Sequence, residues 1–327
     1  MIISKTPFRI SFFGGGTDYP AWYEEHGGAV LSTTIDKYCY ISLRYLPPFF
    51  EHKHRIIYSS IENVKSIEEI QHPVVRALLK YFNIKNGMEI HHDGDLPARS
   101  GLGSSSAFTV GMLNSMYALK GRIISKSELA KQAIDIERNI LKENVGSQDQ
   151  VAVACGGFNK ITFHKDHDFY IEPMTLHKER FIQLEKHLML VFTGFSRFAS
   201  EIAAEQIKNT QDRKKELTVM KQMVDHAIEI LNSNQDIIKF GKLLNDSWKL
   251  KKCLSSKISN SKLDDLYKNA LKYGAVGGKL LGAGGGGFML LFVRPENRKK
   301  LKQGLKNYLE VKFSFENEGS QIIYYNP

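Results

Sequence analysis

Glycines, hydroxyl side chains and one cation are combined in the segment PARSGLGSSSA, residues 97–107. Gly101 and Gly103 flank a single leucine and allow the backbone to approach a ligand closely. The serines at 104–106 occupy the first turn of an expected helix, where free N–H groups and the positive end of the helix dipole coincide. Such a turn can bind an anion, and Arg99 adds positive charge beside it. The alternative is an ordinary serine-capped helix after a flexible loop. The segment is not a Walker A loop, because no Gly-Lys-Ser/Thr follows the glycines.

Two carboxylates further along the chain could act on a bound anion. Glu137 falls in the apolar stripe of an expected helix that begins with a capping box at Ser125. A carboxylate on a buried face needs a partner, either an arginine or a cation such as magnesium. Asp149 follows Ser147 in a second expected capping box, Ser-x-x-Gln, and the helix dipole alone would favour it there. For both carboxylates the residue types leave a structural and a catalytic role open.

A run of three glycines, residues 14–16, interrupts the first expected strand region. Three consecutive glycines are costly to order, which indicates close backbone approach to a ligand, although a loose loop has the same composition. Asp18 directly after this run could cap a helix that begins at Pro20. Residues 30–34 and 39–43 are expected to form two separate strands, because β-branched and aromatic residues gather there.

The second half of the chain is expected to open with a strand at 187–192 and to continue with long helices. A second glycine run, residues 282–287, lies between two expected strands. It contains a literal Gly-x-Gly-x-x-Gly, but a Rossmann site is excluded because a strand, and not a helix, follows the glycines. A helix at 298–309 and a strand at 322–325 then complete a split βαβ-like second domain.

The length of 327 residues indicates two domains with separate cores. We place the boundary between residues 162 and 185, where periodic pattern gives way to histidines and charges, and divide the chain into residues 1–180 and 181–327. Apolar runs reach only strand length, and the first residues lack a signal-peptide pattern, so we expect no membrane span and no signal peptide. Three cysteines without metal spacing favour a reducing cytoplasm.

The formal net charge of +10 raises the question of an anionic partner. The lysines cluster at 208–221, 249–257 and 298–306, where apolar residues recur at helical spacing, so we interpret these clusters as solvated helix faces. No platform of aromatic and basic residues supports nucleic-acid binding. Arg197 follows a strand-to-helix turn, where a cation opposes the helix dipole. It is therefore expected to meet an anion, the alternative being a surface ion pair with Glu201.

These motifs together resemble a known family. PARSGLGSSSA resembles the second signature of the GHMP kinases, the superfamily of galactokinase, homoserine kinase, mevalonate kinase and phosphomevalonate kinase. TPFRISFFGGGTDYP resembles the first signature, GSQDQVAVACGGFN the segment of the catalytic aspartate, and the glycines at 282–287 the third signature, all in the family order. The resemblance implies an α+β, two-domain GHMP kinase fold, with a ribosomal-S5-like N-terminal domain that binds ATP and a ferredoxin-like C-terminal domain. It also implies that the third signature packs under the phosphate loop.

The resemblance further implies roles for single residues. Asp149 would accept or orient the proton of the substrate hydroxyl, and Arg9 would keep Asp149 ionised. Glu137 and Ser105 would hold Mg²⁺, with Ser105 preferred over Ser106. The residues implied in binding the ATP phosphates are Arg99, Ser100, Gly101, Leu102, Gly103, Ser104, Ser105 and Ser106. The residues implied in binding the substrate are Gly15, Gly16, Thr17, Asp18, Arg197 and Gly285.

The substrate class rests on finer likenesses. FFGGGTDYP, GSQDQ with GGFN, and TGFSRFASEI most resemble the bacterial kinases of D-glycero-D-manno-heptose 7-phosphate, which implies phosphorylation of the anomeric hydroxyl. Where galactokinase has Gly-Glu-His, this chain has three glycines, which leaves room for a larger or differently charged sugar. One alternative is a fucokinase-like or other sugar 1-kinase. Another is a catalytically silent sugar sensor, but the presence of Arg9, Glu137 and Asp149 argues against a sensor. The expected partner is a small sugar phosphate, with no nucleic acid and no membrane; a homodimer stays open.

Overall fold

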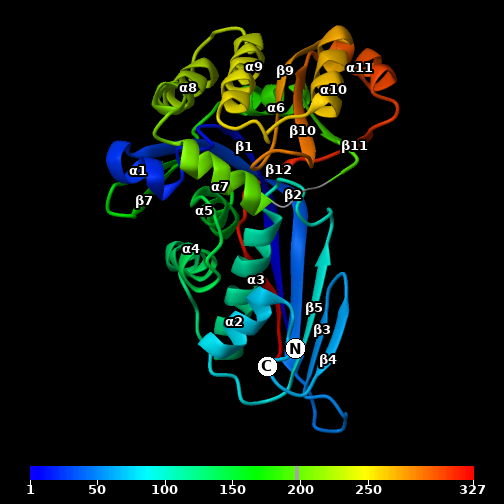
Figure 1. Ribbon diagram of the computed structural model, residues 1–327. Coiled ribbons are helices and arrows are strands. Elements are labelled where there is room, and N and C mark those ends of the chain that lie inside the picture. The colour runs from blue at the N-terminus through cyan, green and yellow to red at the C-terminus, as the bar shows by residue number, and fades with distance from the viewer. Residues whose placement is uncertain (196–198) are drawn as a thin grey trace.

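Two sheets organise the chain (Figure 1), and the computed structural model describes residues 1–195 and 199–327. The strands of the larger sheet are β1 (Ile2–Phe13), β2 (Gly28–Tyr45), β3 (His54–Ile57), β4 (Ile61–Val64), β5 (Met88–Gly94), β6 (Phe158–Phe163), β7 (Phe169–Pro173), β12 (Phe315–Glu316) and β13 (Gln321–Tyr325). Its nine strands follow the path β13-β1-β2-β5-β3-β4, with β6 and β12 on β2 and β7 on β6. The smaller sheet contains β8 (Leu188–Phe192), β9 (Ala275–Leu280), β10 (Phe288–Val293) and β11 (Leu309–Val311).

Strands β1 and β2 form the longest pairing and are each continuous, where the sequence predicted two strands in the region of β2. The predicted break between residues 34 and 39 is only a shift in register opposite the Pro7–Phe8 step. Phe8 and Phe12 of β1 are buried on one face of the sheet. Arg9, on the opposite face, is also buried. Both faces of β1 are therefore buried here. One carries apolar core side chains, and the other carries the polar side chain of Arg9.

The helices of the N-terminal half lie on one side of the larger sheet in Figure 1. They are α1 (Pro20–His26), α2 (Pro73–Tyr81), α3 (Ser104–Leu119), α4 (Lys126–Asp135), a π-helical turn η1 (Ile136–Ile140) and α5 (Gln148–Cys155). α3 begins at the predicted serines and ends before Gly121, as the sequence predicted. It packs directly on β1, because a Cβ on Gly111 would lie only 2.9 Å from the Thr6 hydroxyl. The glycine loop is thus fixed at the N-terminus of a buried helix.

The smaller sheet is antiparallel with the order β11-β8-β10-β9. Numbered along the chain, its four strands stand in the order 4-1-3-2, which is the ferredoxin-like arrangement that was expected. The helices of this half are α6 (Lys178–His187), α7 (Ala199–Asn209), α8 (Lys214–Asn232), α9 (Ile238–Cys253), α10 (Ser261–Lys272), the 3-10 turn η2 (Pro295–Asn297) and α11 (Arg298–Gly304). Helices α9 and α10 pack on β9, with Trp248 and Phe240 fully buried.

The last strand of the chain corrects one expectation. Residues 322–325 were predicted to belong to the second domain, but β13 pairs antiparallel with β1, with Ile2 opposite Tyr325. The short β12 pairs with β2. A five-residue strand that is half exposed carries no sequence signal for the sheet that it joins. The division of the chain at residue 180 stays a prediction, and residues 315–325 complete the first sheet.

Candidate active site

Arg9 and Asp149 form the centre of the site. Arg9 Nε donates to Asp149 Oδ1 at 2.8 Å and Arg9 Nη2 donates to Asp149 Oδ2 at 2.8 Å. The third donor of the guanidinium, Nη1, bonds the carbonyl of Gly101 at 2.7 Å. The arginine is 2% exposed, whereas the aspartate is 27% exposed. A two-pronged pair of this kind fixes the plane of the carboxylate and leaves its outer lone pairs accessible. Arg9 and Asp149 are therefore neighbours, as the resemblance implied.

The glycine loop of residues 97–107, for which the resemblance implied phosphate binding and which we call the phosphate loop, brings the N-terminus of α3 against this pair. Gly103 has the left-handed φ of 74° and stands at the N-cap of α3 without a side-chain cap. A Cβ at this position would lie 3.1 Å from Arg9 Cγ and 3.6 Å from Asp149 Oδ2. Glycine is therefore required both by the backbone angle and by the close approach of the ion pair. The Arg99 N–H donates to Ser104 Oγ at 3.0 Å, which closes the loop.

The two glycine segments meet backbone to backbone, as the sequence predicted. A Cβ on Gly101 would lie 2.5 Å from the Leu281 carbonyl oxygen, and one on Gly282 would lie 2.4 Å from Gly101 Cα. One on Gly287 would reach the Ser100 carbonyl oxygen at 2.2 Å. The same carbonyl accepts from the Phe288 N–H at 3.1 Å. The end of β9 and the start of β10 therefore form the support of the phosphate loop.

Glu137 lies in the π-helical turn η1 and is fully buried. π-turns of this kind frequently occur at functional sites. Its Oε2 accepts from Ser106 Oγ at 3.0 Å and from the Gln150 side-chain amide. Its Oε1 has no hydrogen-bond partner among the described residues. Burial in this setting raises the pKa of Glu137 to about 7. The carboxylate is thus held by neutral donors and lacks a counter-charge.

The serine beside Glu137 is Ser106, and not the Ser105 that was preferred from the sequence. Ser106 is buried against Glu137, whereas Ser105 is exposed. The expected capping box of α5 is also wrong. The hydroxyl of Ser147 accepts from Arg138 Nη2 at 2.8 Å, and the Gln150 side chain turns to Glu137. At Ser125 the N-cap bond of the expected box is present, since the serine hydroxyl accepts from the Glu128 N–H, while the Glu128 carboxylate accepts from the Gln132 side chain.

The glycine run after β1 forms a tight turn that reaches α5. A Cβ on Gly14 would lie 1.9 Å from the carbonyl oxygen of residue 29. Thr17 donates its hydroxyl to the Gly14 carbonyl at 2.8 Å, so it fixes this turn. Asp18 accepts from the Gly16 N–H at 2.9 Å and from the Gln148 N–H at 3.4 Å. It does not cap α1. Asp18 is buried, and this burial raises its pKa.

The donor set at Glu137 fits magnesium bound to a nucleotide. The described residues contain no group of three or more His, Cys, Asp and Glu side chains that could hold a metal. Mg²⁺ in phosphate sites keeps several waters and takes only one or two carboxylates, because substrate phosphates complete its shell. One carboxylate with an unpartnered oxygen, beside a hydroxyl at the N-terminus of α3, satisfies that requirement.

Comparison with known proteins identifies the family. The description "GHMP kinases N terminal domain" matches residues 68–157, and "GHMP kinases C terminal" matches residues 223–311. The chain is 31% identical to a D-glycero-alpha-D-manno-heptose 7-phosphate kinase of Campylobacter jejuni over 97% of either chain. The chain belongs to the GHMP kinases. As a member of this family it is an ATP-dependent kinase, and its relatives that act on sugars make it a sugar kinase.

Further relatives extend this GHMP assignment to the fold. A bifunctional fucokinase/GDP-fucose pyrophosphorylase of Arabidopsis thaliana is 25% identical and matches over 94% of this chain, although over only 31% of its own length. The crystal structure of a D-glycero-D-manno-heptose 1-phosphate kinase from Bacteroides thetaiotaomicron superposes with a TM-score of 0.81 at 23% identity over the whole of both chains. The ribosomal-S5-like and ferredoxin-like arrangement is thereby confirmed.

Four sequence predictions need separate mention in this GHMP kinase. Arg197 lies outside the described residues. The backbone N–H of Gly285 donates to the Ile258 carbonyl at 2.9 Å, and its role in substrate binding stays a prediction. None of the described helices is long and apolar enough to cross a membrane. The roles of Gly15 and Gly16 in substrate binding stay predictions.

Two functional candidates were missed in the sequence. Lys251 was assigned to a solvated helix face, but it is 7% exposed, and Lys279 at the end of β9 is 2% exposed. Lys279 Nζ donates at 2.8 Å to the carbonyl of Phe12, which lies near the end of β1 and two residues before the glycine turn. A lysine inside an otherwise apolar and glycine-rich strand segment, AVGGKLLG, was the available signal. Lysine is rarely fully buried without a partner.

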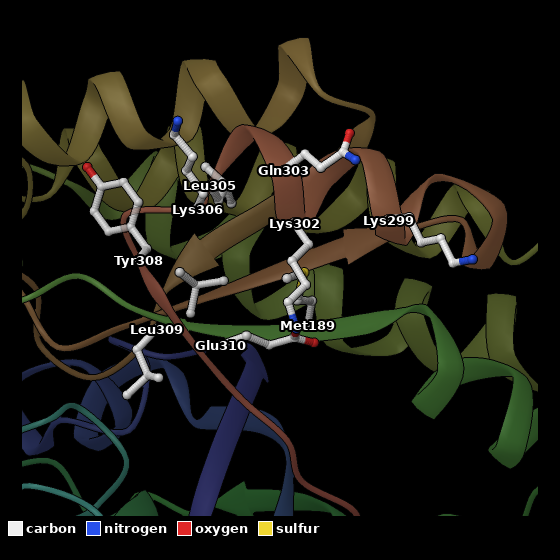
Figure 2. Close-up of a pocket in the computed structure, with 10 residues that line it drawn as sticks. Met189, Lys299, Lys302, Gln303, Leu305, Lys306, Tyr308, Leu309 and Glu310 are labelled. Atoms are coloured by element: carbon white, nitrogen blue, oxygen red, sulfur yellow. The ribbon is translucent and has the colours of Figure 1, made fainter.

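A separate pocket lies on the smaller sheet, away from the kinase site. Figure 2 shows it between the segment around α11 and the strands β8 and β11. Its volume is about 600 Å³. Lys299, Lys302 and Lys306 line it together with Met189. Lys302 forms an ion pair with Glu310 at 3.2 Å. The pocket contains no residue of the glycine segments or of the Arg9–Asp149 pair, so it does not contribute to the candidate active site.

Proposed function

We propose that the protein transfers the γ-phosphoryl group of ATP to the anomeric hydroxyl of D-glycero-D-manno-heptose 7-phosphate and so forms the 1,7-bisphosphate. The observation that carries the kinase chemistry is the position of Asp149, held by Arg9 against Gly103 at the N-terminus of α3. The named activity of the Campylobacter jejuni relative, which aligns along nearly all of this chain, supports the choice of sugar.

Asp149 acts on the sugar hydroxyl in this proposal. Its two oxygens accept from Arg9, so the carboxylate stays oriented and acceptor-only toward the substrate. It takes the hydroxyl proton while the sugar oxygen bonds to the γ-phosphorus, and the bond from that phosphorus to the bridging oxygen breaks to release ADP. A general base contributes about 10²–10⁴-fold to such a step.

Positive groups around the loop stabilise the charge that develops on the phosphoryl oxygens. The first turn of α3 offers N–H groups without partners inside the helix. Glu137 and Ser106 would hold Mg²⁺, because they supply an unpartnered carboxylate oxygen and a hydroxyl at the same place. The ion, when bound, neutralises and orients the nucleotide phosphates. We therefore assign the hydroxyl ligand to Ser106 in place of Ser105.

A free-sugar 1-kinase is the second candidate. The likeness to the Arabidopsis thaliana fucokinase over 94% of this chain favours it. The glycine turn at 14–16 carries no side chain that would select a phosphate over a hydroxyl. The anion contact that would distinguish the two substrates was assigned to Arg197, which lies outside the described residues.

One assay tests the reaction and the sugar together. ADP release is measured with MgATP against free hexoses and heptoses and against their 6- and 7-phosphates, for the wild type, Asp149→Asn and Asp225→Asn. Asp225 pairs with Lys160 on the surface and is a matched control. We expect turnover with heptose 7-phosphate, loss of about 10²–10⁴-fold in Asp149→Asn, and wild-type turnover in the control.

Other outcomes separate the alternatives. Turnover with a free hexose such as fucose would keep the kinase and reject the heptose phosphate. Binding of sugars without turnover would indicate a sensor. Full activity in Asp149→Asn would reject the catalytic role of this carboxylate.

A further inference from the structure

Two buried lysines stand behind the phosphate loop without a counter-ion. Lys251 of α9 donates through Nζ to the carbonyls of Leu280, at 2.8 Å, and Gly282. Lys279 of β9 donates to the Phe12 carbonyl. Neither ammonium forms an ion pair with any described carboxylate. Both lysines therefore place a positive group in the interior with only carbonyl dipoles as partners.

The lysines belong to the same contact network as the catalytic pair. The Gly282 carbonyl accepts from Lys251, and Gly282 touches Gly101 of the phosphate loop. The Gly101 carbonyl in turn accepts from Arg9. Lys279 holds the end of β1, the strand that carries Arg9. Each lysine thus contacts backbone that positions the phosphate loop or the arginine.

The charges around these lysines leave a positive excess. Arg9 of β1, Asp18 of the glycine turn and Asp149 of α5 are the charged groups that act on the pair. With both lysines protonated, this buried region holds three cations and two carboxylates. Burial lowers the pKa of Lys279 to about 7 and lowers that of Lys251 as well. A buried charge without compensation is costly, so an anion at the site would restore the protonated form.

We propose that Lys251 and Lys279 are positioning residues for a polyphosphate ligand, which supplies the negative charge that this buried cluster lacks. The proposal deepens the proposed function, because the ligand is the phosphate chain of the nucleotide. The lysines act through the carbonyls of Leu280, Gly282 and Phe12, which belong to the backbone that holds the phosphate loop and Arg9, and through their charge. Because burial lowers the pKa of both lysines, binding of the polyphosphate is then coupled to proton uptake by this pair.

The alternative is that the lysines only tie the two sheets together. Lys279→Met and Lys251→Met distinguish the roles, because methionine keeps an unbranched side chain and removes the charge. Methionine leaves the carbonyls that accept from Nζ without this donor, so a fall in melting temperature alone does not separate the two roles. A positioning role predicts weaker ligand binding that Lys279→Arg restores, whereas a tether predicts a lower melting temperature with wild-type affinity in the folded protein.

The experiment is calorimetric titration of the full-length protein with inorganic tripolyphosphate and Mg²⁺ at pH 7.5, in two buffers of different ionisation enthalpy. The variants are Lys251→Met, Lys279→Met, Lys279→Arg and Lys221→Met. Lys221 is the matched control, because its Nζ also bonds a backbone carbonyl, that of His26, outside the site. Melting temperatures are measured for all of them.

We expect the wild type to take up part of a proton on binding, because burial lowers the pKa of both lysines and the arriving anion favours their protonated forms. Lys279→Met binds at least about tenfold more weakly, since an opposite charge near the ligand is lost, and takes up less of a proton than the wild type. Lys251→Met also binds about tenfold more weakly. Lys279→Arg keeps the affinity with less proton uptake, and Lys221→Met behaves as the wild type.

Two results would overturn the inference. One is wild-type affinity and proton uptake in Lys279→Met and Lys251→Met. The other is weaker binding by Lys279→Met that Lys279→Arg does not restore. The proposed function fails separately, if the wild type binds tripolyphosphate but phosphorylates no sugar. A wild type that binds no polyphosphate would overturn the inference, whereas the proposed function would still be decided by the sugar assay.

Discussion

Asp149 is partly exposed and shares two hydrogen bonds with Arg9, whereas Glu137 is fully buried and receives hydrogen bonds only from neutral groups. Both carboxylates lie within reach of residues in the first turn of α3. One has its counter-charge in the protein, and the other has an oxygen without any partner among the described residues. The protein thus supplies a counter-charge for Asp149 but none for Glu137, where the proposed function places a bound cation.

That difference follows from local structure. Asp149 begins a regular α-helix and faces an arginine on the central strand β1. Glu137 sits in a π-turn, which rotates its side chain into the interior beside α3. A group that must act on a substrate needs a fixed charge and an open side, and a group that must bind a cation needs neutral support.

Removing Arg9 should have the largest effect on activity, because Asp149 would then lack a counter-charge, as Glu137 does. We expect Arg9→Met to lower kcat by about 10²–10³-fold, since the carboxylate loses its orientation and the site loses a positive charge. Arg9→Lys restores the charge but not the two-pronged geometry, so it should recover only part of the activity. Steady-state kinetics with MgATP and the sugar measure both.

The control for this prediction is Arg44→Met, which removes an arginine paired with Glu89 at the surface. Equal loss of activity in Arg9→Met and Arg44→Met would show that the Arg9–Asp149 pair has no special role.

Replacing Glu137 by glutamine should change the pH dependence of folding. The pKa of this group is about 7 in the folded protein and 4.5 in the unfolded chain. Between these values the folded protein binds a proton that the unfolded chain does not, so wild-type stability falls as pH rises from about 4.5 to about 7. Relative to pH 4, Glu137→Gln should therefore gain up to about 3 kcal/mol over the wild type at pH 8.

Urea unfolding at the two pH values, without Mg²⁺ and nucleotide, measures this difference. Glu296→Gln, at an exposed position, is the control. Parallel pH dependence of the wild type and Glu137→Gln would mean that Glu137 is compensated within the protein after all.

The smallest expected effect concerns the Mg²⁺ dependence of the rate, which tests whether Ser106 or Ser105 provides the hydroxyl beside Glu137. Ser106→Ala should raise the Mg²⁺ concentration for half-maximal rate by about tenfold, because ligands and their supporting partners commonly contribute that much. Ser105→Ala should leave it within about twofold, since Ser105 is exposed. Initial rates over a range of Mg²⁺ at saturating ATP give both values. The reverse order would return the role to Ser105.

The sequence predicted those parts of the site in which residue type and function coincide. Glycines that admit a close backbone approach, and an arginine and an aspartate in recognisable segments, could be found without a structure. Gly101 and Gly282 touch because neither has a side chain, and this requirement is visible in the letters themselves.

The remaining parts depend on packing that a linear pattern does not contain. Ser105 and Ser106 differ by about 100° around α3, and only the position of η1 decides which one meets Glu137. Lys251 has the sequence surroundings of an exposed helix face, yet the glycine segment covers it. The partner sheet of β13 is likewise decided by the whole fold.

The pairing of β13 with β1 has a consequence for biosynthesis. The strand that carries Arg9 leaves the ribosome well before β13, which closes one of its edges and follows about 320 positions later. At typical elongation rates of about 5–20 residues per second, β1 waits for roughly 15–60 s before that edge is covered. During translation Arg9 therefore lies on a strand with one unpaired edge, which a chaperone could cover.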